Sequence, residues 1–327
     1  MKRAICLTLI FVMAVSFAFA RGGGDRSSEV IRLRLAENQP RDNPITIGMF
    51  RFADLVREKT GGTVEIEVFP DAMLGNETET IDQIHAGTLD FARVNTSALA
   101  ATADAMALYT LPFIFISYDH KYRVLDGEIG RASMATLERT NMVGLEFWEA
   151  GSRHFYTTRT PIRQLSDMRG LRIRVQPSEV AIRMVGLLGA VATPMAYGEV
   201  FQALQTGVID GAENDFVSYY TSGHYEAARN LSLSGHMAPP AVLLASKRTF
   251  DRLSASQQQA IREAAREAAI WQRQAMNDFQ DESRRRTEAA GTTVYQVNVV
   301  EFQNAVGEIY DSYPQFRTQI EAIKALQ

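Results

Sequence analysis

Leu171-Arg172-Ile173-Arg174-Val175-Gln176-Pro177 is the stretch of this chain that says most about its fold. Apolar residues occupy every second position from Leu171 to Val175, and arginine or glutamine occupies the positions between them, a pattern that predicts a strand with one polar face. Arg174 therefore falls near the carboxyl end of a short strand, where ligands bind in open α/β sheets. A guanidinium at that place can hold a carboxylate or phosphate through two hydrogen bonds, or can form an ion pair within the protein.

The residues before this stretch alternate short strands with helices. Strands are predicted at 31–35, 64–68 and 91–95, where β-branched and other apolar residues recur. A helix from Asn43 to Lys59 and a helix from Asn76 to Ala86 lie between them, and each begins with a capping residue and ends near glycine. This β-α-β-α-β order predicts an α/β fold with a parallel sheet and helical crossovers.

A second series of the same kind surrounds the opening stretch. Strands are predicted at 142–148, 171–175 and 208–212, and helices at 179–188 and 198–206, each helix being followed by a glycine. The repetition of alternating elements predicts a second α/β unit.

The last third of the chain contains the longest helical pattern. An apolar strand is expected at 242–246, and its flanks suggest that it returns to the first sheet. A capping box that begins at Ser254 then starts a helix from Ala255 to Ala290, which at ~1.5 Å per residue spans roughly 50 Å and can bridge two domains. A strand at 294–299 and a helix at 301–310 complete the pattern.

The length of the chain indicates how many domains it has, and its N-terminus indicates its compartment. At 327 residues the chain is longer than one core usually supports, so two domains are expected. Residues 1–20 are predicted to be a signal peptide, with Lys2 and Arg3 before an apolar run and Ala18-Phe19-Ala20 as the cleavage site. The run is shorter than the ~20 residues of a membrane span. We therefore expect a periplasmic protein that loses its single cysteine, Cys6, with the signal.

Composition and missing motifs exclude several classes of function. The 34 basic and 38 acidic residues give a formal net charge of −4, or −6 without Lys2 and Arg3, and no basic cluster suggests nucleic acid or an anionic membrane as a partner. The G-x-S-x-G nucleophile motif, the Walker loop and the G-x-G-x-x-G dinucleotide motif do not occur. The five histidines lack metal-ligand spacing. We expect no catalytic residue, no metal and no cofactor.

Polar residues at the ends of the predicted strands are the candidates for a binding site. They are Asn38, Asn95, Arg153, Arg174 and Asn214, with Tyr197 nearby in sequence. Two arginines and several amides suit an acidic small molecule that carries hydroxyl groups. Each residue also has a structural interpretation: the asparagines can be turn formers, Arg153 a surface charge and Tyr197 a core residue. Glu77 and Glu79 can be a catalytic pair, or can complement the dipole of the helix that begins there.

Five segments together resemble one known family, the DctP-type substrate-binding proteins of TRAP transporters. They are 168–175 (MRGLRIRV), 192–200 (ATPMAYGEV), 203–214 (ALQTGVIDGAEN), 87–91 (GTLDF) and 111–113 (LPF). The resemblance implies a periplasmic binding protein fold, with two α/β lobes around a ligand cleft and one long helix packed across both. It also makes the lobes discontinuous, with 21–150 plus 237–275 in the first and 151–236 plus 276–327 in the second.

The resemblance assigns roles to the candidate residues. Arg174 matches the arginine that forms a salt bridge with the ligand carboxylate, and Arg153 matches a second arginine that supports or shares this contact. Asn214 matches an asparagine that faces the ligand, and Tyr197 matches an aromatic lining position. By a looser alignment, Asn38, Asn95 and Glu77 fall where ligand contacts of the first lobe occur.

The ligand class follows from further similarities. The segments 36–40, 91–95, 150–153 and 222–225 look like the branch of the family that binds uronic or other sugar acids. The resemblance therefore implies capture of a uronate such as D-glucuronate or D-galacturonate and delivery to a TRAP membrane permease by a monomer. Asp215-Phe216 departs from the family, where asparagine and tryptophan are frequent. A C4-dicarboxylate ligand, a secreted sugar-acid lyase or isomerase, and a binding protein that serves a sensor kinase or a chemoreceptor are the alternatives.

Overall fold

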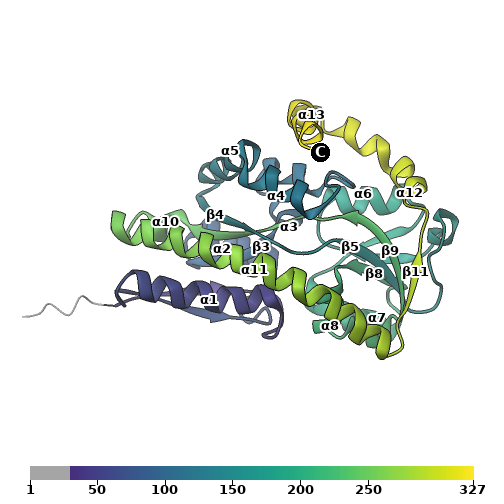
Figure 1. The fold of residues 1–327 in the computed structure, drawn as a ribbon, viewed down its shortest axis with the longest axis horizontal. Helices are drawn as coiled ribbons and strands as arrows, with labels where there is room; N and C mark the ends of the chain where they lie inside the picture. Colours follow the sequence, from purple (N-terminus) through teal and green to yellow (C-terminus); the bar gives the residue numbers. More distant parts are fainter. Residues whose placement is uncertain (1–29) are drawn as a thin grey trace, which may run out of the picture.

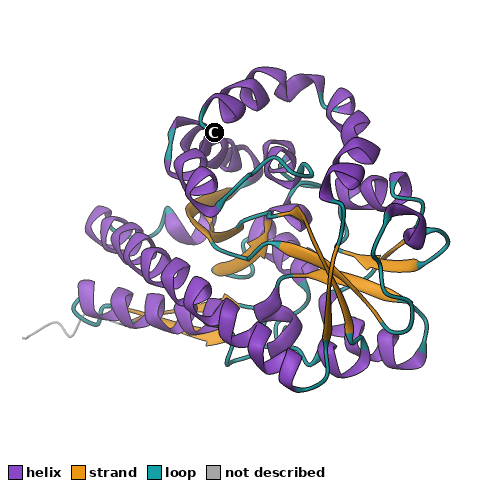
Figure 2. Cartoon of the chain, turned by 45° about the vertical axis from the view of Figure 1, so that its right-hand side comes forward, coloured by secondary structure: helices purple, strands orange, loops and turns teal. Residues whose placement is uncertain are grey.

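The computed structural model describes residues 30–327, and the predicted signal peptide lies outside them. Two β-sheets, each covered by helices, lie side by side and are joined by crossing segments and one long helix (Figure 1, Figure 2). No helix within residues 30–327 combines the length and the apolar character that a membrane crossing requires.

The first sheet has the strand order β2-β1-β3-β10-β4. Its strands are β1 (Ile31–Ala36), β2 (Val64–Phe69), β3 (Phe91–Asn95), β4 (Met142–Trp148) and β10 (Ala241–Ser246). The strand β1 pairs in parallel with β2 and β3, whereas β10 runs antiparallel between β3 and β4. Both the parallel unit and the return of the chain to this sheet are as predicted.

Local capping explains where the two crossover helices of the first sheet begin. In α1 (Pro44–Lys59), the Asn43 side chain accepts a hydrogen bond from the backbone N–H of Ile45, and proline occupies the first turn. In α2 (Glu77–Ala86), Asn76 and Glu79 form the expected capping box, and Gly87 ends the helix with a φ of 74°. The start of α2 matters for function because it places Glu77 at the carboxyl end of β3.

The second sheet has the strand order β11-β9-β5-β8-β6-β7. Its strands are β5 (Arg153–Thr157), β6 (Arg172–Val175), β7 (Val191–Pro194), β8 (Gly211–Asn214), β9 (Asn230–Met237) and β11 (Thr293–Gln296). The strand β6 lies in parallel between β7 and β8, and β5 runs antiparallel to β8 and β9. The helices α6 (Glu179–Leu187) and α7 (Val200–Thr206) are the crossovers, and α8 (Phe216–Thr221) and α9 (His224–Ala227) follow β8.

Two predicted strands are displaced. The strand expected at 208–212 runs instead from Gly211 to Asn214, because the amides of Val208 and Ile209 bond to the Ala203 carbonyl at the end of α7. The strand expected at 294–299 ends at Gln296, and Val299 begins the helix α12 (Val299–Val306). The first displacement moves Asn214 from a loop into the last position of a strand.

Several elements lie in segments that the strand and helix patterns left unassigned. Between β3 and β4 these are α3 (Thr96–Leu99), α4 (Tyr118–Asp126) and α5 (Glu128–Thr136), and α10 (Lys247–Phe250) follows β10. Because these helices are short, few of their residues recur at helical spacing, and the pattern is difficult to recognise in the sequence. The strands β5, β7 and β9 were likewise not predicted.

The long helix α11 (Ala255–Ala289) is confirmed almost residue for residue and begins with the predicted capping box of Ser254 and Gln257. Its first half packs on α1 and β4, and its second half reaches α8 beside the second sheet (Figure 1). Alanines at 260, 264, 265 and 268 are buried, so the helix can approach α1 closely. The helix therefore braces both sheets from one side.

The C-terminal segment returns toward the first sheet. After β11 and α12 the chain ends with α13 (Arg317–Ala325). The His120 ring lies 2.9 Å from the Ile323 carbonyl oxygen, and the Tyr310 hydroxyl donates to the Pro112 carbonyl at 2.8 Å. Figure 2 shows an arc of helices that ends at the C-terminus, and the two contacts attach this segment to α4 and to the residues before it. The lobe boundaries deduced from the sequence stay a prediction.

Residues 149–152 and 238–240 connect the two sheets, and the first connection is held in place by buried polar groups. The Glu149 backbone N–H and C=O both bond to the Gln272 side chain of α11, at 3.0 and 2.9 Å. The Glu149 carboxylate pairs with Lys121, and both side chains are buried. These contacts attach the first connection to α11 and to α4, in which Lys121 lies.

Replacing Gly151 with alanine in this connection is expected to destabilise the protein by about 2 kcal/mol or more. Gly151 has a φ of 79°, and an added Cβ would overlap the buried side chain of Asp215. The measurement is urea denaturation of the unliganded protein. Gly186→Ala in α6 is the matched control, because nothing lies within 4 Å of its added Cβ and alanine favours the helix by about 0.5–1 kcal/mol. Equal stabilities of the two variants would contradict this account.

Candidate ligand-binding site

All seven residues predicted from the sequence line one small cavity of about 10 Å³ between the two sheets. They are Asn38, Glu77, Asn95, Arg153, Arg174, Tyr197 and Asn214. A second cavity of about 210 Å³ shares Asn38, Glu77, Arg174 and Tyr197 with the first, so the two adjoin. The residues belong to elements up to 176 positions apart in sequence, and only the packing of the two sheets against each other brings them together.

Strand direction explains why these side chains meet. Asn38 follows β1, and Asn95 and Asn214 are the last residues of β3 and β8, so they lie at the carboxyl ends of strands. Arg174 is in the second half of β6. Arg153 is the first residue of β5, and it reaches the same edge because β5 is antiparallel to β8.

Arg174 is a buried cation that lacks an acidic partner among residues 30–327. Its side chain is closed off from solvent, with 2% of the residue exposed. Its Nε and Nη2 both donate to the Met195 carbonyl oxygen, at 3.1 and 2.7 Å, and the Tyr197 ring lies 5.9 Å from its Cζ. None of the salt bridges among the described residues includes it. Burial lowers the pKa of Arg174, and the charge of Glu213, which acts in the opposite direction, does not outweigh it.

Arg153 is also buried, but it is fully paired. The interpretation of Arg153 as a surface charge is therefore wrong. It forms an ion pair with the Glu213 carboxylate, and its Nη1 donates to Asn214 Oδ1 at 2.7 Å. Burial alone would raise the pKa of Glu213, but the charge of Arg153, the nearby His236 ring and the hydrogen bonds from Arg153 lower it to about 2. The pair therefore stays ionised, and it holds Asn214 in place.

Sequence reasoning missed a third buried arginine in the cavity wall, Arg93. Its guanidinium pairs with both carboxylate oxygens of Glu37 and contacts Glu77 and Asn38. Burial alone would lower the pKa of Arg93, but the Glu37 charge outweighs it and the pKa is raised. Because side chains alternate between the two faces of β3, Arg93 lies on the same face as Asn95, two residues later. This spacing was the signal by which Arg93 could have been found in the sequence.

Opposite net charges face each other across the cavity. On the side of the first sheet, Glu37 and Glu77 outnumber Arg93, so the wall carries one net negative charge. On the side of the second sheet, the cavity-lining Arg153 and Arg174 outnumber Glu213, the ion-pair partner of Arg153, so these three groups carry one net positive charge, and burial raises the pKa of the adjacent Asp215. The arrangement suits a ligand with one anionic end and one neutral polar end.

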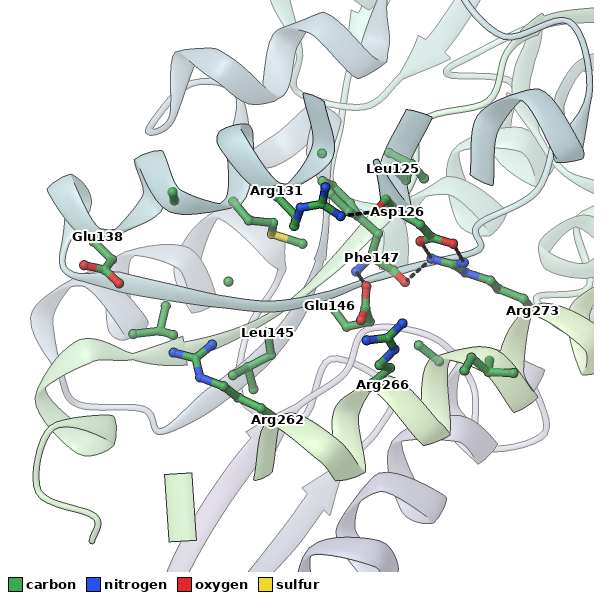
Figure 3. Close-up of a pocket in the computed structure, with 17 residues that line it drawn as sticks. Leu125, Asp126, Arg131, Glu138, Leu145, Glu146, Phe147, Arg262, Arg266 and Arg273 are labelled. Atoms are coloured by element: carbon green, nitrogen blue, oxygen red, sulfur yellow. Dashed lines mark hydrogen bonds and ion pairs between the residues drawn. The ribbon is translucent and has the colours of Figure 1, made fainter. Parts of the chain in front are cut away.

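A larger pocket of about 430 Å³ lies outside this region, between α5, β4 and α11 (Figure 3). Two of its four arginines are engaged within the protein: Arg273 pairs with both carboxylate oxygens of Asp126, at 2.7 and 2.8 Å, and Arg131 donates to the Asp126 carbonyl oxygen. None of the residues predicted from the sequence lies there. Within residues 30–327, no cluster of three histidine, cysteine or acidic side chains is arranged to hold a metal ion.

Comparison with known proteins gives consistent results. Residues 35–316 match the family model described as bacterial extracellular solute-binding protein, family 7. A solute-binding protein of Chromohalobacter salexigens is 40% identical over 273 residues, which are 83% of this chain and 81% of that protein. A TRAP periplasmic solute-binding protein of Xanthobacter autotrophicus, solved with β-D-galacturonate, has a TM-score of 0.88 at 43% identity and covers 90% of this chain and 100% of its own. Another from Chromohalobacter salexigens, solved with D-glucuronate, has a TM-score of 0.86 at 38% identity and covers 90% and 99%.

Proposed function

The chain belongs to family 7 of the bacterial extracellular solute-binding proteins, the DctP family of TRAP systems, and we propose that its solute is a hexuronate, D-galacturonate or D-glucuronate. Membership and the two-sheet fold confirm the expectations drawn from the sequence motifs. Delivery of the acid from the periplasm to a TRAP membrane permease is the role that follows for this chain.

Arg174 is the observation that carries the proposal. A buried guanidinium without a counterion costs several kcal/mol in general, and a ligand carboxylate would offset that cost when it binds. The Nη1 atom of Arg174 makes no hydrogen bond to a described residue, and Arg174 lines both cavities. This supports the carboxylate contact that family resemblance assigns to Arg174.

The charges of the two walls favour a sugar acid over a C4-dicarboxylate. A carboxylate against Arg174 leaves the rest of the ligand facing Glu77 and Asn95 on the negative wall. Hydroxyl groups can donate to those oxygens, whereas a second carboxylate would be repelled by Glu77 and could not donate. This contrast supports the uronate branch over the dicarboxylate alternative.

Closure of the two halves around the ligand is the proposed mechanism, and it includes no chemical step. Asn43, which caps α1, donates to the Thr221 hydroxyl of α8 at 3.2 Å, so the halves already touch across the cavity. A ligand that contacts both walls binds the closed arrangement better and shifts the equilibrium toward it. A lyase or isomerase would need a base poised to remove a carbon-bound proton. Conversion of uronate by the purified protein would favour that alternative.

A thermal-shift experiment tests the proposed ligand. D-Galacturonate or D-glucuronate at 100-fold above Kd is expected to stabilise the protein by about 2.7 kcal/mol and to raise Tm accordingly. Succinate and D-galactose are the controls, because the first lacks hydroxyls and the second lacks the carboxylate. A shift with succinate but not with either uronate would reverse the assignment.

A further inference from the structure

The three asparagines of the cavity are held by charged neighbours, and those neighbours decide which end of each amide faces the ligand. The Oδ1 of Asn38 accepts a hydrogen bond from Arg93. The Oδ1 of Asn214 accepts from Arg153 Nη1 at 2.7 Å and from the Asp215 backbone N–H at 3.0 Å. The Asn214 oxygen already accepts two hydrogen bonds, and the contact with Arg93 turns the Asn38 oxygen toward the guanidinium, so each amide has its Nδ2 hydrogens to offer.

In Asn95 it is the amide nitrogen, and not the oxygen, that a charged neighbour holds. Its Nδ2 donates to Glu77 Oε1 at 2.8 Å, and its backbone N–H donates to the same oxygen at 2.8 Å. The Oδ1 of Asn95 is buried and lacks a partner among the described residues. The second Glu77 oxygen also receives no hydrogen bond from them. Asn95 and Glu77 therefore present acceptors beside the donor of Asn38.

Arg93 connects these groups. Its Nε lies 2.7 Å from Glu37 Oε2, its Nη2 contacts Glu37 Oε1 and Asn38 Oδ1, and its Nη1 lies 3.4 Å from Glu77 Oε1. The side chain of Arg93 has no solvent-exposed surface. Without the guanidinium, the Asn38 amide could turn over and present its oxygen.

We propose that Arg93 is a positioning residue for specificity: it makes the first-sheet wall present the amide donor of Asn38 beside the acceptors of Asn95 and Glu77. Such a wall accepts a ligand hydroxyl, which donates and accepts, and rejects a keto, fluoro or carboxylate group, which only accepts. The inference rests on the proposed sugar-acid function. It adds that a hydroxyl hydrogen is required at one ligand position.

Calorimetry with monodeoxyfluoro analogues of D-galacturonate, substituted at C2, C3 or C4, tests this requirement. Fluorine keeps the size and accepts weakly but cannot donate. One of the three analogues is expected to bind the wild-type protein at least ~100-fold more weakly than D-galacturonate, because a buried acceptor would be left unsatisfied. Losses below about tenfold at all three positions would overturn the proposal.

The double variant Arg93→Met/Glu37→Met tests the role of Arg93. It removes one charge of each sign, so the wall keeps its net charge while Asn38 is released. Because the released Asn38 amide can present its oxygen as a further acceptor, the fluorine penalty is expected to grow by about tenfold over that of the wild type. The control is Arg32→Met/Glu65→Met, which removes an exposed pair from β1 and β2 of the same sheet and should leave the penalty unchanged. An unchanged penalty in the Arg93 variant overturns the inference even though the wild type binds uronate, whereas no uronate binding by the wild type overturns the proposed function itself.

Asn38→Asp provides an independent variant if the double variant does not fold. It keeps the shape and the contact with Arg93 but replaces the Nδ2 donor by an acceptor. We expect at least ~100-fold weaker binding of D-galacturonate with the melting temperature retained. Wild-type affinity in this variant would show that Asn38 does not act as a donor, and would overturn the proposal.

Discussion

Arg174→Met is expected to weaken binding of D-galacturonate by about 3–5 kcal/mol, roughly 200- to 5,000-fold in Kd, with the fold retained. The ligand carboxylate would lose its partner in a site where water cannot replace it. The unliganded variant is expected to be as stable as the wild type or more stable, since burial lowers the pKa of Arg174 and the nearby charge of Glu213 does not outweigh this effect. Calorimetry and urea denaturation measure the two quantities.

Arg172→Met is the matched control for this prediction. Arg172 lies two positions earlier in β6, but its side chain is 46% exposed and pairs with Asp210 at 2.7 Å. Its loss should change neither affinity nor stability by more than about 1 kcal/mol. If Arg174→Met retained wild-type affinity, Arg174 would not be the carboxylate anchor. If it lost affinity together with its fold, the buried cation would be structural.

In contrast to Arg174→Met, which is expected to retain stability, Arg153→Met is expected to lose about 3–5 kcal/mol of stability in the unliganded protein. The substitution leaves the Glu213 carboxylate buried without its ion-pair partner, and it releases Asn214. The double variant Arg153→Met/Glu213→Met removes both charges and should recover most of that loss. Failure of the double variant to recover stability would mean that the pair is not the cause.

The pair also predicts how stability depends on pH. The pKa of Glu213 is about 2 in the folded protein, and about 4.3 for glutamate in an unfolded chain. A lowered folded-state pKa contributes stability above about pH 4.3 that is lost as the pH falls toward 2. Glu213→Gln should therefore remove part of the acid sensitivity in urea denaturation between these pH values, and an unchanged pH profile would contradict the assignment.

Local patterns made much of this fold predictable from the sequence. The capping boxes at Asn76 and Ser254 and the 35-residue helix α11 depend on residues within a few positions of one another, and all were predicted. The displaced strand at 211–214 shows the limit, because the turn before it is set by hydrogen bonds to Ala203 at the end of α7. Strand-end positions and the family resemblance together identified seven residues that line the cavity, but they missed Arg93, whose partner Glu37 is 56 positions away.

The sequence by itself predicted that Arg174 lies near the carboxyl end of a strand, because period-2 alternation is a local property, and that Arg153 follows the strand at 142–148. Only the tertiary structure decided that the two arginines differ. In the register of the second sheet, the residue paired with Arg174 on one side is Ala212 and on the other Thr193, neither of which can carry a charge. Arg153 begins a strand that runs antiparallel to β8 and so lies within reach of Glu213. Strand register therefore leaves one guanidinium without an acid, and that guanidinium is the one placed to receive a ligand carboxylate.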